Sequence, residues 1–370
     1  MHIKISKSSL SEALNNVATI VSSKTSLPVL QNVKIEAEGE RATFVCSDLD
    51  TTLFATTDCE VVEGGATTIP VKTFAAAVSK VVDGIIEIKV DDKDVAKLQA
   101  GSTRFSFRGL PAKDFPVFPK TEGAPVKIDC KVVREMFRQT AFAMSQDDTR
   151  RTLLSVLLDF SSGDGNVKAV ATDGRRLSLA HDTVGVPPDF KNSFVVPRKA
   201  VETLLKKLPR EGECNLIAQG SLLKFETPRL VLLTKLLEDA YPAYGKVIPS
   251  ITADNKIVID RAAFLGAIDR ISVFTSGTES PTMVLTFGNN RLVLASGDTE
   301  FGSSVDEIAI KYSGETIEMR FNPQYISEAL NVLGDEDEIE FYLINDTSPV
   351  VIRKVNSDDY TYVVMPLRTK

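Results

Sequence analysis

Residues 2–21 read HIKISKSSLSEALNNVATIV, and they join a strand-like alternation to a helix-like apolar pattern through one polar residue. Ser6 stands at the change of period. Its hydroxyl can accept a backbone N–H of a first helical turn, so we expect a helix to begin directly after it. Leu10, Leu14 and Val17 then recur at helical spacing, which predicts one apolar stripe packed against a core.

The same pattern occurs twice more, as VKIDCKVVREMFRQTAFAM at residues 126–144 and as KIVIDRAAFLGAIDRISVF at residues 256–274. Asp129 and Asp260 take the place of Ser6 and are equally suitable helix caps. The apolar stripe recurs at Val133, Phe137 and Thr140, and again at Phe264, Ile268 and Ile271. Thr140 is the weakest match because it is polar. Three copies of one pattern predict three similar structural units.

Each copy continues with a second helical segment that a proline introduces. The segments are IPVKTFAAAVSKVV after Thr68, VVPRKAVETLLKKLP after Phe194 and RFNPQYISEALNVLG after Met319. Proline suits the position where a strand turns into the first helical residue. The stretches between the two helices are rich in strand formers and contain SDLD (47–50), ATDG (171–174) and SGDT (296–299), which predict hairpin turns.

The repeat is much longer than a solenoid unit of roughly 20 to 50 residues and has the length of a small domain. Polar, loop-like segments, TEGAP (121–125) and SITADN (250–255), separate the copies. We therefore predict three domains, at residues 1–123, 124–253 and 254–370. The fold class is α+β, with three tandem similar domains, each an antiparallel sheet with two helices.

The composition is that of a globular protein, with 43% hydrophobic and 25% charged residues among 370. No run approaches the roughly 18 to 20 apolar residues that span a bilayer, and the N-terminus lacks a signal-peptide pattern, so we expect a cytoplasmic protein. Cys46, Cys59, Cys130 and Cys214 are scattered without a CxxC pair, and there are only two histidines. We therefore expect reduced thiols and neither a metal nor a cofactor.

The net charge of −7 argues against a nucleic-acid partner until its distribution is considered. In the six predicted helices with their flanks (7–24, 70–82, 130–151, 197–210, 261–274 and 320–333), Lys and Arg outnumber Asp and Glu by ten, so the remaining residues carry −17. Basic helices beside acidic sheets and loops favour a protein that holds a polyanion loosely on one surface.

The candidate DNA-facing residues are basic residues of these helices and their flanks: Lys24, Lys72, Lys80, Arg134, Arg138, Arg150, Arg151, Arg198, Lys199, Lys206 and Lys207. The alternative is that these cations simply solvate helix surfaces, since Lys and Arg are good helix formers. Few aromatic residues accompany them, so stacking on single-stranded bases is not indicated.

Several longer motifs resemble the bacterial DNA sliding clamps, the β subunits of DNA polymerase III. They are SLPVLQNVKIEAEG (26–39), SDLD (47–50), RFSFRGLPAKDFP (104–116), ATDGRRL (171–177), VVPRK (195–199), YPAYGKVIP (241–249), FNPQY (321–325) and YVVMPLR (362–368). The resemblance covers essentially the whole chain, and several motifs in order at family spacing are far more specific than one short pattern.

The resemblance implies a head-to-tail homodimer, a closed ring of six domains whose helices line a central hole. Such a ring encircles duplex DNA without sequence preference and tethers the replicative polymerase, which makes it a processivity factor of DNA replication. The clamp loader and other DNA-processing proteins are the further partners implied, and no membrane is. A ring that encloses DNA does not have to bind it tightly, so a modest, salt-sensitive positive potential on its inner face is enough. An acidic overall composition is therefore compatible with a DNA partner.

The resemblance also implies a cleft where partners insert a short peptide. Carried over residue by residue, it comprises Leu153, Thr172, Gly174, Arg175, Arg176, Leu177, Pro242, Lys246, Val247, Asn322, Tyr325, Val363, Met365, Pro366, Leu367 and Arg368. Apolar members suit Leu or Phe anchors, and Arg176 and Arg368 suit acidic or carbonyl groups of the peptide. Lys246 stands where the family often has Arg. The loops at 275–281 and 347–349 do not align cleanly and receive no cleft residue.

For the subunit interface, the resemblance points to edge strands of the first and third domains. Its residues are Arg104 and Phe105 of one subunit, and Val273, Phe274, Asp306 and Glu307 of the other.

Two alternative functions make different demands on the sequence. An enzyme would need a supported catalytic motif, but the sequence contains no P-loop, GxSxG or HExxH pattern. The acidic run GDEDEIE (334–340) is interpreted as a solvated loop rather than a magnesium site. A multi-domain adaptor that binds proteins but not DNA is the second alternative, and it predicts a persistent monomer in dilute solution.

Overall fold

The computed structural model describes residues 1–370 apart from 23–24, 120, 188, 276–279, 299–301 and 369–370. The chain forms two compact units, which are described separately. The first comprises Met1–Arg134 with Lys199–Glu238, and the second comprises Glu135–Arg198 with Asp239–Lys370. This division passes through the central repeat of the sequence, because that repeat contributes strands to the sheets of both units.

The first unit holds two antiparallel sheets and the helices α1 (Lys7–Val17) and α2 (Val71–Lys80), with most of α4 (Arg198–Lys207). The five-stranded sheet has the order β5 (Glu60–Glu63), β1 (His2–Ser6), β7 (Ile85–Val90), β8 (Val95–Ala100) and β9 (Thr103–Arg108). The eight-stranded sheet has the order β10 (Val126–Asp129), β15 (Glu213–Gln219), β16 (Leu222–Glu226), β17 (Leu230–Lys235), β4 (Thr51–Asp58), β3 (Arg41–Ser47), β2 (Asn32–Glu38) and β6 (Gly65–Pro70).

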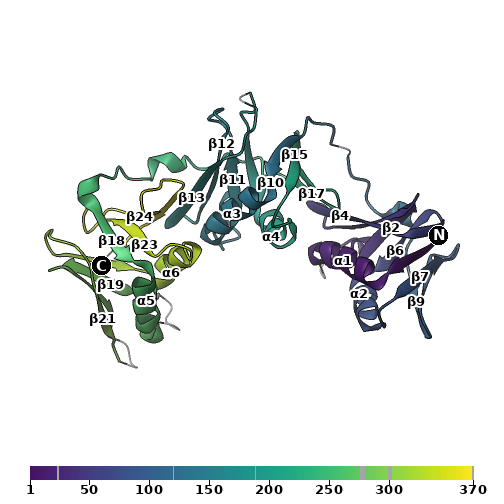
Figure 1. The fold of residues 1–370 in the computed structure, drawn as a ribbon, viewed down its shortest axis with the longest axis horizontal. Helices are drawn as coiled ribbons and strands as arrows, with labels where there is room; N and C mark the ends of the chain where they lie inside the picture. Colours follow the sequence, from purple (N-terminus) through teal and green to yellow (C-terminus); the bar gives the residue numbers. More distant parts are fainter. Residues whose placement is uncertain (23–24, 120, 188, 276–279, 299–301, 369–370) are drawn as a thin grey trace. The chain divides into compact units, whose positions relative to one another are not determined.

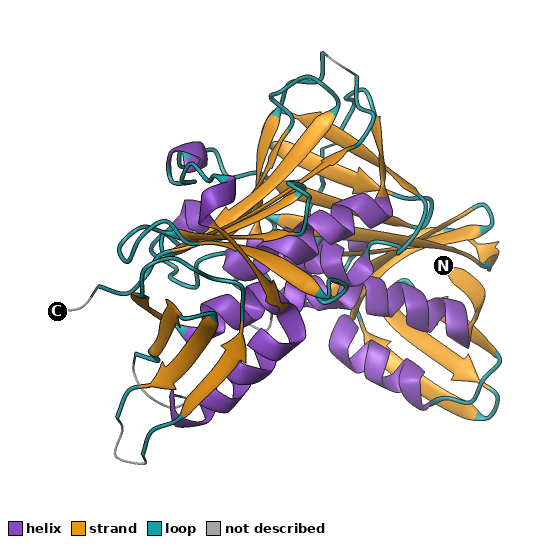
Figure 2. Cartoon of the chain, turned by 60° about the vertical axis from the view of Figure 1, so that its left-hand side comes forward, coloured by secondary structure: helices purple, strands orange, loops and turns teal. Residues whose placement is uncertain are grey.

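The second unit has the same kind of build, with the helices α5 (Arg261–Thr275) and α6 (Pro323–Val332). Its eight-stranded sheet has the order β14 (Ser193–Pro197), β11 (Ser155–Asp159), β12 (Asn166–Thr172), β13 (Arg176–Thr183), β25 (Tyr360–Val364), β24 (Val350–Lys354), β23 (Glu338–Tyr342) and β18 (Lys256–Asp260). Its four-stranded sheet has the order β21 (Val305–Ala309), β20 (Arg291–Ser296), β19 (Met283–Gly288) and β22 (Ile317–Phe321). Figure 1 labels many of these elements, and Figure 2 separates helices from strands by colour.

Each eight-stranded sheet is shared between two neighbouring repeats. In the first unit β17 of the second repeat pairs with β4 of the first, from Leu230↔Ala55 to Thr234↔Thr51. In the second unit β25 of the third repeat pairs with β13 of the second, from Tyr360↔Ala180 to Val364↔Arg176. The central repeat contributes strands to both sheets, and this is why the compact units divide it.

The predicted helix caps are confirmed. The Ser6 side chain accepts a hydrogen bond from the backbone N–H of Ser9 at 3.0 Å, and Asp260 accepts one from Ala263 at 2.7 Å. Asp129 does the same for Lys131 at 2.7 Å, at the start of α3 (Cys130–Thr140). Each bond satisfies one of the N–H groups that a helix leaves without an internal partner.

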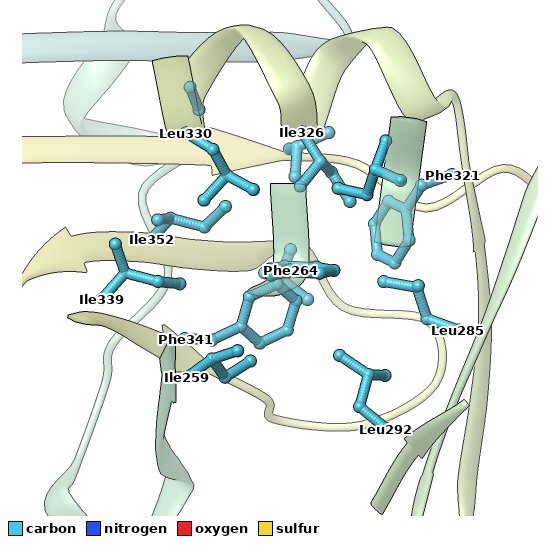
Figure 3. Close-up of a cluster of buried hydrophobic side chains, with 14 of the residues drawn as sticks. Ile259, Phe264, Leu285, Leu292, Phe321, Ile326, Leu330, Ile339, Phe341 and Ile352 are labelled. Atoms are coloured by element: carbon cyan, nitrogen blue, oxygen red, sulfur yellow. The ribbon is translucent and has the colours of Figure 1, made fainter. Parts of the chain in front are cut away.

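The apolar stripes face cores, as predicted. In the third repeat, Phe264, Ile268 and Ile271 of α5 are fully buried among residues of both sheets and of α6. Figure 3 shows Phe264 beside Phe341 and Ile259, with Ile326 and Leu330 of α6 close by. Thr140, the polar exception, is also fully buried, and its hydroxyl donates to the Met136 carbonyl at 2.7 Å. A threonine is tolerated in the stripe because this bond satisfies its hydroxyl.

The hairpin predictions hold with one difference. SDLD and ATDG join β3 to β4 and β12 to β13 through tight connections. The third pair, β20 and β21, is joined by the longer connection 297–304, and Thr299 of the SGDT motif lies outside the described residues. None of the described helices is both long and apolar enough to cross a membrane.

The interpretation of GDEDEIE as a solvated loop is partly wrong. Its last residues belong to β23, where Glu340 is buried. The Glu340 carboxylate accepts hydrogen bonds from the Tyr342 hydroxyl at 2.7 Å and from Lys256 Nζ at 3.0 Å. These bonds lower the pKa of Glu340 although burial by itself would raise it. The strand continues through the acidic run because a buried carboxylate is acceptable when charged and polar partners satisfy it.

Candidate functional site

The β12–β13 hairpin turn carries the first group of predicted cleft residues. Asp173 accepts the backbone N–H groups of Arg175 at 2.8 Å and Arg176 at 3.0 Å through the same oxygen. The Thr172 hydroxyl donates to the Arg176 carbonyl at 2.6 Å and accepts the N–H of Gly174 at 3.1 Å. Gly174 has φ +86°, which an L residue rarely adopts. The turn is therefore fixed by its own hydrogen bonds.

The C-terminal segment lies directly beside this turn. Strand β25 continues the sheet next to β13, with Val363 opposite Leu177. Beyond the strand, the N–H of Met365 donates to the Arg175 carbonyl at 3.0 Å, and that of Leu367 donates to the Arg320 carbonyl at 2.7 Å. The structure thus brings together two predicted motifs that are far apart in the sequence.

The side chain of Arg176 is buried and paired with groups of the second unit. It is only 6% exposed, and its guanidinium forms ion pairs with Asp173 and Glu328. It also donates to the Phe142 carbonyl at 2.8 Å and lies over the Tyr325 ring. Burial would lower the pKa of Arg176, but Tyr362 and Glu328 outweigh that effect and raise it. The Arg176 guanidinium is therefore held by groups of its own unit, whereas Arg175 and Arg368 are exposed.

A pocket of about 370 Å³ opens on this side of the second unit. Four predicted cleft residues line it, namely Arg175, Arg176, Asn322 and Tyr325. The sequence did not point to the other lining residues as part of a cleft: Met144, Ser145, Gln146, Asp147, Arg150, Asp173 and Gln324. Most of them lie in the connection after α3, where no motif marked them, and only the fold brings that connection to the hairpin turn.

The predicted cleft residues Pro242, Lys246 and Val247 lie in the segment 241–249. A short 3₁₀ turn, Tyr244–Lys246, is held in place because the Tyr244 hydroxyl donates to Asp159 at 3.0 Å. Burial and the neighbouring Asp159 raise the pKa of Tyr244 to about 12. Pro242, Lys246 and Val247 are exposed on this turn, and Met365 is exposed on the C-terminal segment. Of the remaining predicted members, Leu153, Pro366 and Leu367 are half-buried, and Thr172, Leu177 and Val363 are buried.

Several cations predicted to face DNA are engaged by the protein itself. Arg134 donates to the carbonyls of Leu205 at 2.6 Å and Leu208 at 2.9 Å, which caps the end of α4. Arg138 pairs with Glu135 at 2.5 Å, and Lys207 donates to the Asn15 carbonyl at 2.6 Å. These contacts give the side chains a structural role that the charge pattern did not indicate.

The next three cations are engaged in the same way. Lys199 forms an ion pair with Asp48 and also donates to the Ile20 carbonyl. Arg198 donates to the Ser145 carbonyl. Arg150 lies in the wall of the pocket, where it donates to the Asp173 carbonyl at 3.3 Å, which places it beside the hairpin turn.

Four candidate cations remain exposed without a hydrogen bond or ion pair to any described residue: Lys72, Lys80, Arg151 and Lys206. Lys24 lies outside the described residues. Burial and the neighbouring Lys206 lower the pKa of Lys207, which is the effect expected where like charges crowd one helix end. Most of the cations predicted to face DNA thus have donors engaged within the protein, whereas Lys72, Lys80, Arg151 and Lys206 do not among the described residues.

The predicted interface residues lie on or beside sheet edges. Arg104 and Phe105 belong to β9, an edge strand of the first unit, and Asp306 and Glu307 belong to β21, an edge strand of the second. Asp306 pairs with Arg270 at 2.5 Å and Glu307 with Arg291 at 3.0 Å. The two carboxylates thus have partners within their own unit. Val273 is exposed and Phe274 is half-buried near the end of α5.

No group of three or more His, Cys, Asp or Glu in the described parts of the chain is arranged to hold a metal ion. Cys46, Cys130 and Cys214 are buried free thiols, and Cys59 is half-buried. Burial raises the pKa of Cys46, so this thiol is a poor nucleophile.

Three family models match the chain in order. They are the N-terminal domain of the DNA polymerase III beta subunit at residues 1–119, the central domain at 127–243 and the C-terminal domain at 246–368. Together they account for nearly all of the chain.

Full-length relatives agree with these matches. The beta sliding clamp of Pseudomonas aeruginosa is 30% identical over 372 residues and is covered completely, as is this chain. That of Chlamydia muridarum is 27% identical over 369 residues, which cover 100% of this chain and 99% of the relative.

Solved structures share the fold over the full length of both chains. The DNA polymerase III subunit beta of P. aeruginosa has a TM-score of 0.93 at 28% identity, and the DNA polymerase sliding clamp of Bacillus subtilis has a TM-score of 0.95 at 26% identity. A P. aeruginosa clamp has also been solved bound to griselimycin. With three clamp domains in order and matches that span the entire chain, this protein belongs to the DNA polymerase III beta subunit family, the bacterial sliding clamps.

Proposed function

We propose that two copies of this chain close head to tail into a ring around duplex DNA and tether other proteins through the cleft beside the β12–β13 turn. Family membership makes the chain a sliding clamp of the replicative polymerase, a processivity factor rather than an enzyme. The proposal adds the dimer, the residues that face DNA and the partner cleft. It includes domain boundaries at 123/124 and 253/254 and a place of action in the cytoplasm.

The observation that carries the proposal is the way in which neighbouring repeats pair. Strands β17 and β4 join the first two repeats, and β25 and β13 join the last two. Strand β9 has the position in the first repeat that β17 and β25 have in theirs, and β21 corresponds to β4 and β13. Both β9 and β21 are edge strands of their sheets. We call each strand pairing between neighbouring repeats a junction. When β21 pairs with β9 of a second copy, a junction of the same kind forms between the two copies and closes a head-to-tail dimer.

The internal junctions also predict the register of the closing pair. Phe105, Leu232 and Tyr362 are equivalent positions on the last strands of the three repeats. Their partners on the preceding strands are Leu98, Phe225 and Ile352. Asp306, Ala55 and Ala180 are likewise equivalent on β21, β4 and β13. Their partners on the preceding strands are Leu294, Phe44 and Ala169. Transferring the register therefore places Arg104 opposite Val305 of the partner subunit. Both side chains are exposed in the single chain, as a surface that awaits a partner requires.

A disulfide tests this register. Directly opposite residues on one face of an antiparallel pair have Cβ atoms roughly 4.5–5.5 Å apart, close to disulfide geometry, whereas diagonal neighbours are about 7–8 Å apart. Arg104→Cys with Val305→Cys in one chain should give a covalent dimer on mild oxidation. Arg104→Cys with Glu307→Cys, shifted by two residues on the same face, is the matched control and should remain mostly uncrosslinked. Equal crosslinking of both variants, or of neither, contradicts the predicted register.

The topological hold on DNA is tested with the oxidised Arg104→Cys, Val305→Cys ring. Loaded on nicked circular DNA before oxidation, the crosslinked ring should survive high salt and leave when the DNA is linearised. Equal retention on circular and linear DNA would exclude sliding. A persistent monomer at low concentration would favour the adaptor alternative.

The partner cleft rests on the exposed apolar side chains Pro242, Val247 and Met365 and on the pocket of the hairpin turn; the Met365 N–H bonds to the carbonyl of Arg175, which lines that pocket. Proline, valine and methionine next to polar groups suit a short peptide with apolar anchors. Binding of a labelled peptide with Leu and Phe anchors, measured by fluorescence anisotropy, should therefore be lost in Met365→Asp, while the highly exposed surface variant Val117→Asp should bind normally.

A further inference from the structure

The hairpin turns of the two internal junctions contain equivalent positions that differ in charge. Asp50 of the β3–β4 turn lies five residues before Ala55, and Arg175 of the β12–β13 turn lies five residues before Ala180. Ala55 and Ala180 are equivalent in the strand register, so Asp50 and Arg175 are equivalent as well. The second turn therefore has a basic residue where the first has an acidic one.

The segments that bond to these two turns differ in charge too. The Lys235 N–H donates to the Asp50 carbonyl at 2.8 Å, and the Lys235 ammonium pairs with the Asp50 carboxylate at 3.4 Å. The Met365 N–H donates to the Arg175 carbonyl at 3.0 Å, which makes Met365 the equivalent of Lys235. Methionine has no charge, so the ion pair of the first junction has no counterpart in the second.

The first turn of the neighbouring helix shows the same change. In the first junction, Lys199 of α4 forms an ion pair with Asp48 of the β3–β4 turn. Counted along the paired strands, Gln324 of α6 has the position of Lys199, and Asp173 has that of Asp48. The Gln324 amide donates to Glu328 at 2.7 Å. Two lysines thus pair with the first turn, and neutral residues replace both in the second junction.

The two carboxylates that line the pocket of the second junction already have donors from the protein. Asp173 accepts N–H groups of its own turn and pairs with Arg176. Asp147 accepts the backbone N–H of Thr149 at 3.0 Å and the Thr149 hydroxyl at 2.7 Å. A cationic ligand would have to compete with these donors.

The arginines that line the pocket differ in this respect. Arg176 is buried and paired, and Arg150 donates to the Asp173 carbonyl at 3.3 Å and lies 3.8 Å from the Asp147 carboxylate. Arg175 is exposed, and its side chain forms no hydrogen bond or ion pair with any residue that the structure describes. The pocket therefore presents one uncompensated cation, and an anionic group is the ligand that it suits.

We infer that Arg175 binds a carboxylate of the partner peptide, so that the cleft selects peptides in which Asp or Glu stands beside an apolar anchor. This inference rests on the proposed partner cleft and names the chemistry of its ligand. A guanidinium matches the two oxygens of a carboxylate with two parallel hydrogen bonds.

The side chain next to Arg175 favours a peptide over DNA as the source of the anion. Met365 is 45% exposed, and its backbone is bonded to that of Arg175. A peptide can cover the methionine with an apolar anchor while a neighbouring acidic residue reaches the guanidinium. The phosphate backbone of DNA offers the charge without the apolar group.

Matched peptides test the role of Arg175. Labelled peptides share Leu and Phe anchors, and Asp or Asn is placed in turn at each position next to an anchor. At one position the Asp peptide should bind the wild-type protein about fivefold more tightly than the Asn peptide, as measured by fluorescence anisotropy, which is the size expected for an ion pair that solvent partly reaches. Arg175→Gln should bring this ratio close to one, and high salt should lower it in the wild type.

Arg151→Gln is the matched control, because it removes an exposed arginine that does not line the pocket, and it should keep the wild-type ratio. Peptides that bind with a ratio near one at every position, or with an unchanged ratio in Arg175→Gln, overturn the inference and leave the cleft intact. Weaker binding of a short DNA duplex by Arg175→Gln, with an unchanged peptide ratio, assigns the cation to phosphate and also overturns the inference. A wild-type chain that binds none of the peptides removes the proposed cleft itself.

Discussion

The guanidinium carbon of Arg176 lies 4.4 Å from the centroid of the Tyr325 ring and 5.4 Å from that of Phe142. The same side chain pairs with Asp173 of the hairpin turn and with Glu328 of α6. One buried cation therefore connects three elements, the turn, the connection after α3 and the start of α6. Planar stacking together with forked hydrogen bonds is available to arginine and not to lysine.

Removing this cation should be costly. Arg176→Met leaves the Asp173 and Glu328 carboxylates beside each other without their shared partner, and we expect a loss of about 3 kcal/mol in the free energy of unfolding. Arg176→Lys keeps the charge but loses the stack and should recover only part of that loss. Urea unfolding followed by tyrosine fluorescence measures both. Arg175→Met, at the exposed neighbouring residue, is the control, and an equal cost there would show that Arg176 is not special.

Deletion of residues 365–370 should abolish peptide binding and leave the dimer intact. The deletion removes Met365 and the two backbone hydrogen bonds that place the segment against Arg175 and Arg320. The proposed dimer edges, β9 and β21, are not part of this segment. Peptide anisotropy and sedimentation of the same sample provide the two readouts. Unchanged peptide affinity in the deletion would refute the place given to the C-terminal segment.

The exposed cations should govern the salt dependence of DNA binding. Lys206→Ser should lower the slope of log affinity against log salt for a short duplex by about one for each phosphate that this lysine neutralises. Lys199→Ser should change the slope less, because Lys199 is already paired with Asp48. Instead it should cost a few tenths of a kcal/mol in stability, as is usual for a pair that solvent partly screens. Lys93→Ser, in an exposed turn between β7 and β8, is the control, and an equal slope change in all three variants would contradict the assignment.

Thr140→Val should be close to neutral in stability. The Thr140 hydroxyl bonds to a carbonyl of its own helix, so valine removes a buried polar group together with a hydrogen bond that adds little, and we expect a change within about 1 kcal/mol. Thr140→Ser keeps the hydroxyl but loses a methyl group from the core and should cost about 1 kcal/mol. Urea unfolding of the two variants measures both changes in the free energy of unfolding. A large loss of stability in Thr140→Val would mean that the hydroxyl also bonds a group outside its own helix.

Several elements could be predicted from local sequence because their causes are local. Ser6, Asp129 and Asp260 cap helices through bonds to residues two or three positions later, and Leu10, Leu14 and Val17 share a helix face by spacing alone. The run at Glu338–Tyr342 was misinterpreted because its charge pattern says nothing about Lys256, which lies on a strand far earlier in the chain and stabilises Glu340.

The candidate site could be predicted only in part. The motifs at 171–177 and 362–368 are recognisable in the sequence, but they do not show that Glu328 and Phe142 enclose Arg176. Nor does a count of Lys and Arg show that Arg134 caps the end of α4 or that Arg150 lines a pocket. The role of a Lys or Arg side chain depends on which carbonyl and carboxylate groups lie within hydrogen-bonding distance. Segments far away in the sequence supply these groups.

The sequence by itself determined that this chain consists of three α+β repeats, because capping and apolar periodicity act over a few residues and recur in register. Tertiary structure alone decided how the repeats join, since strand pairing at sheet edges is a contact between residues far apart in the chain. It also decided which side chains remain available. Arg175 and Arg176 are neighbours in the sequence, and only the packing around them leaves one exposed and buries the other.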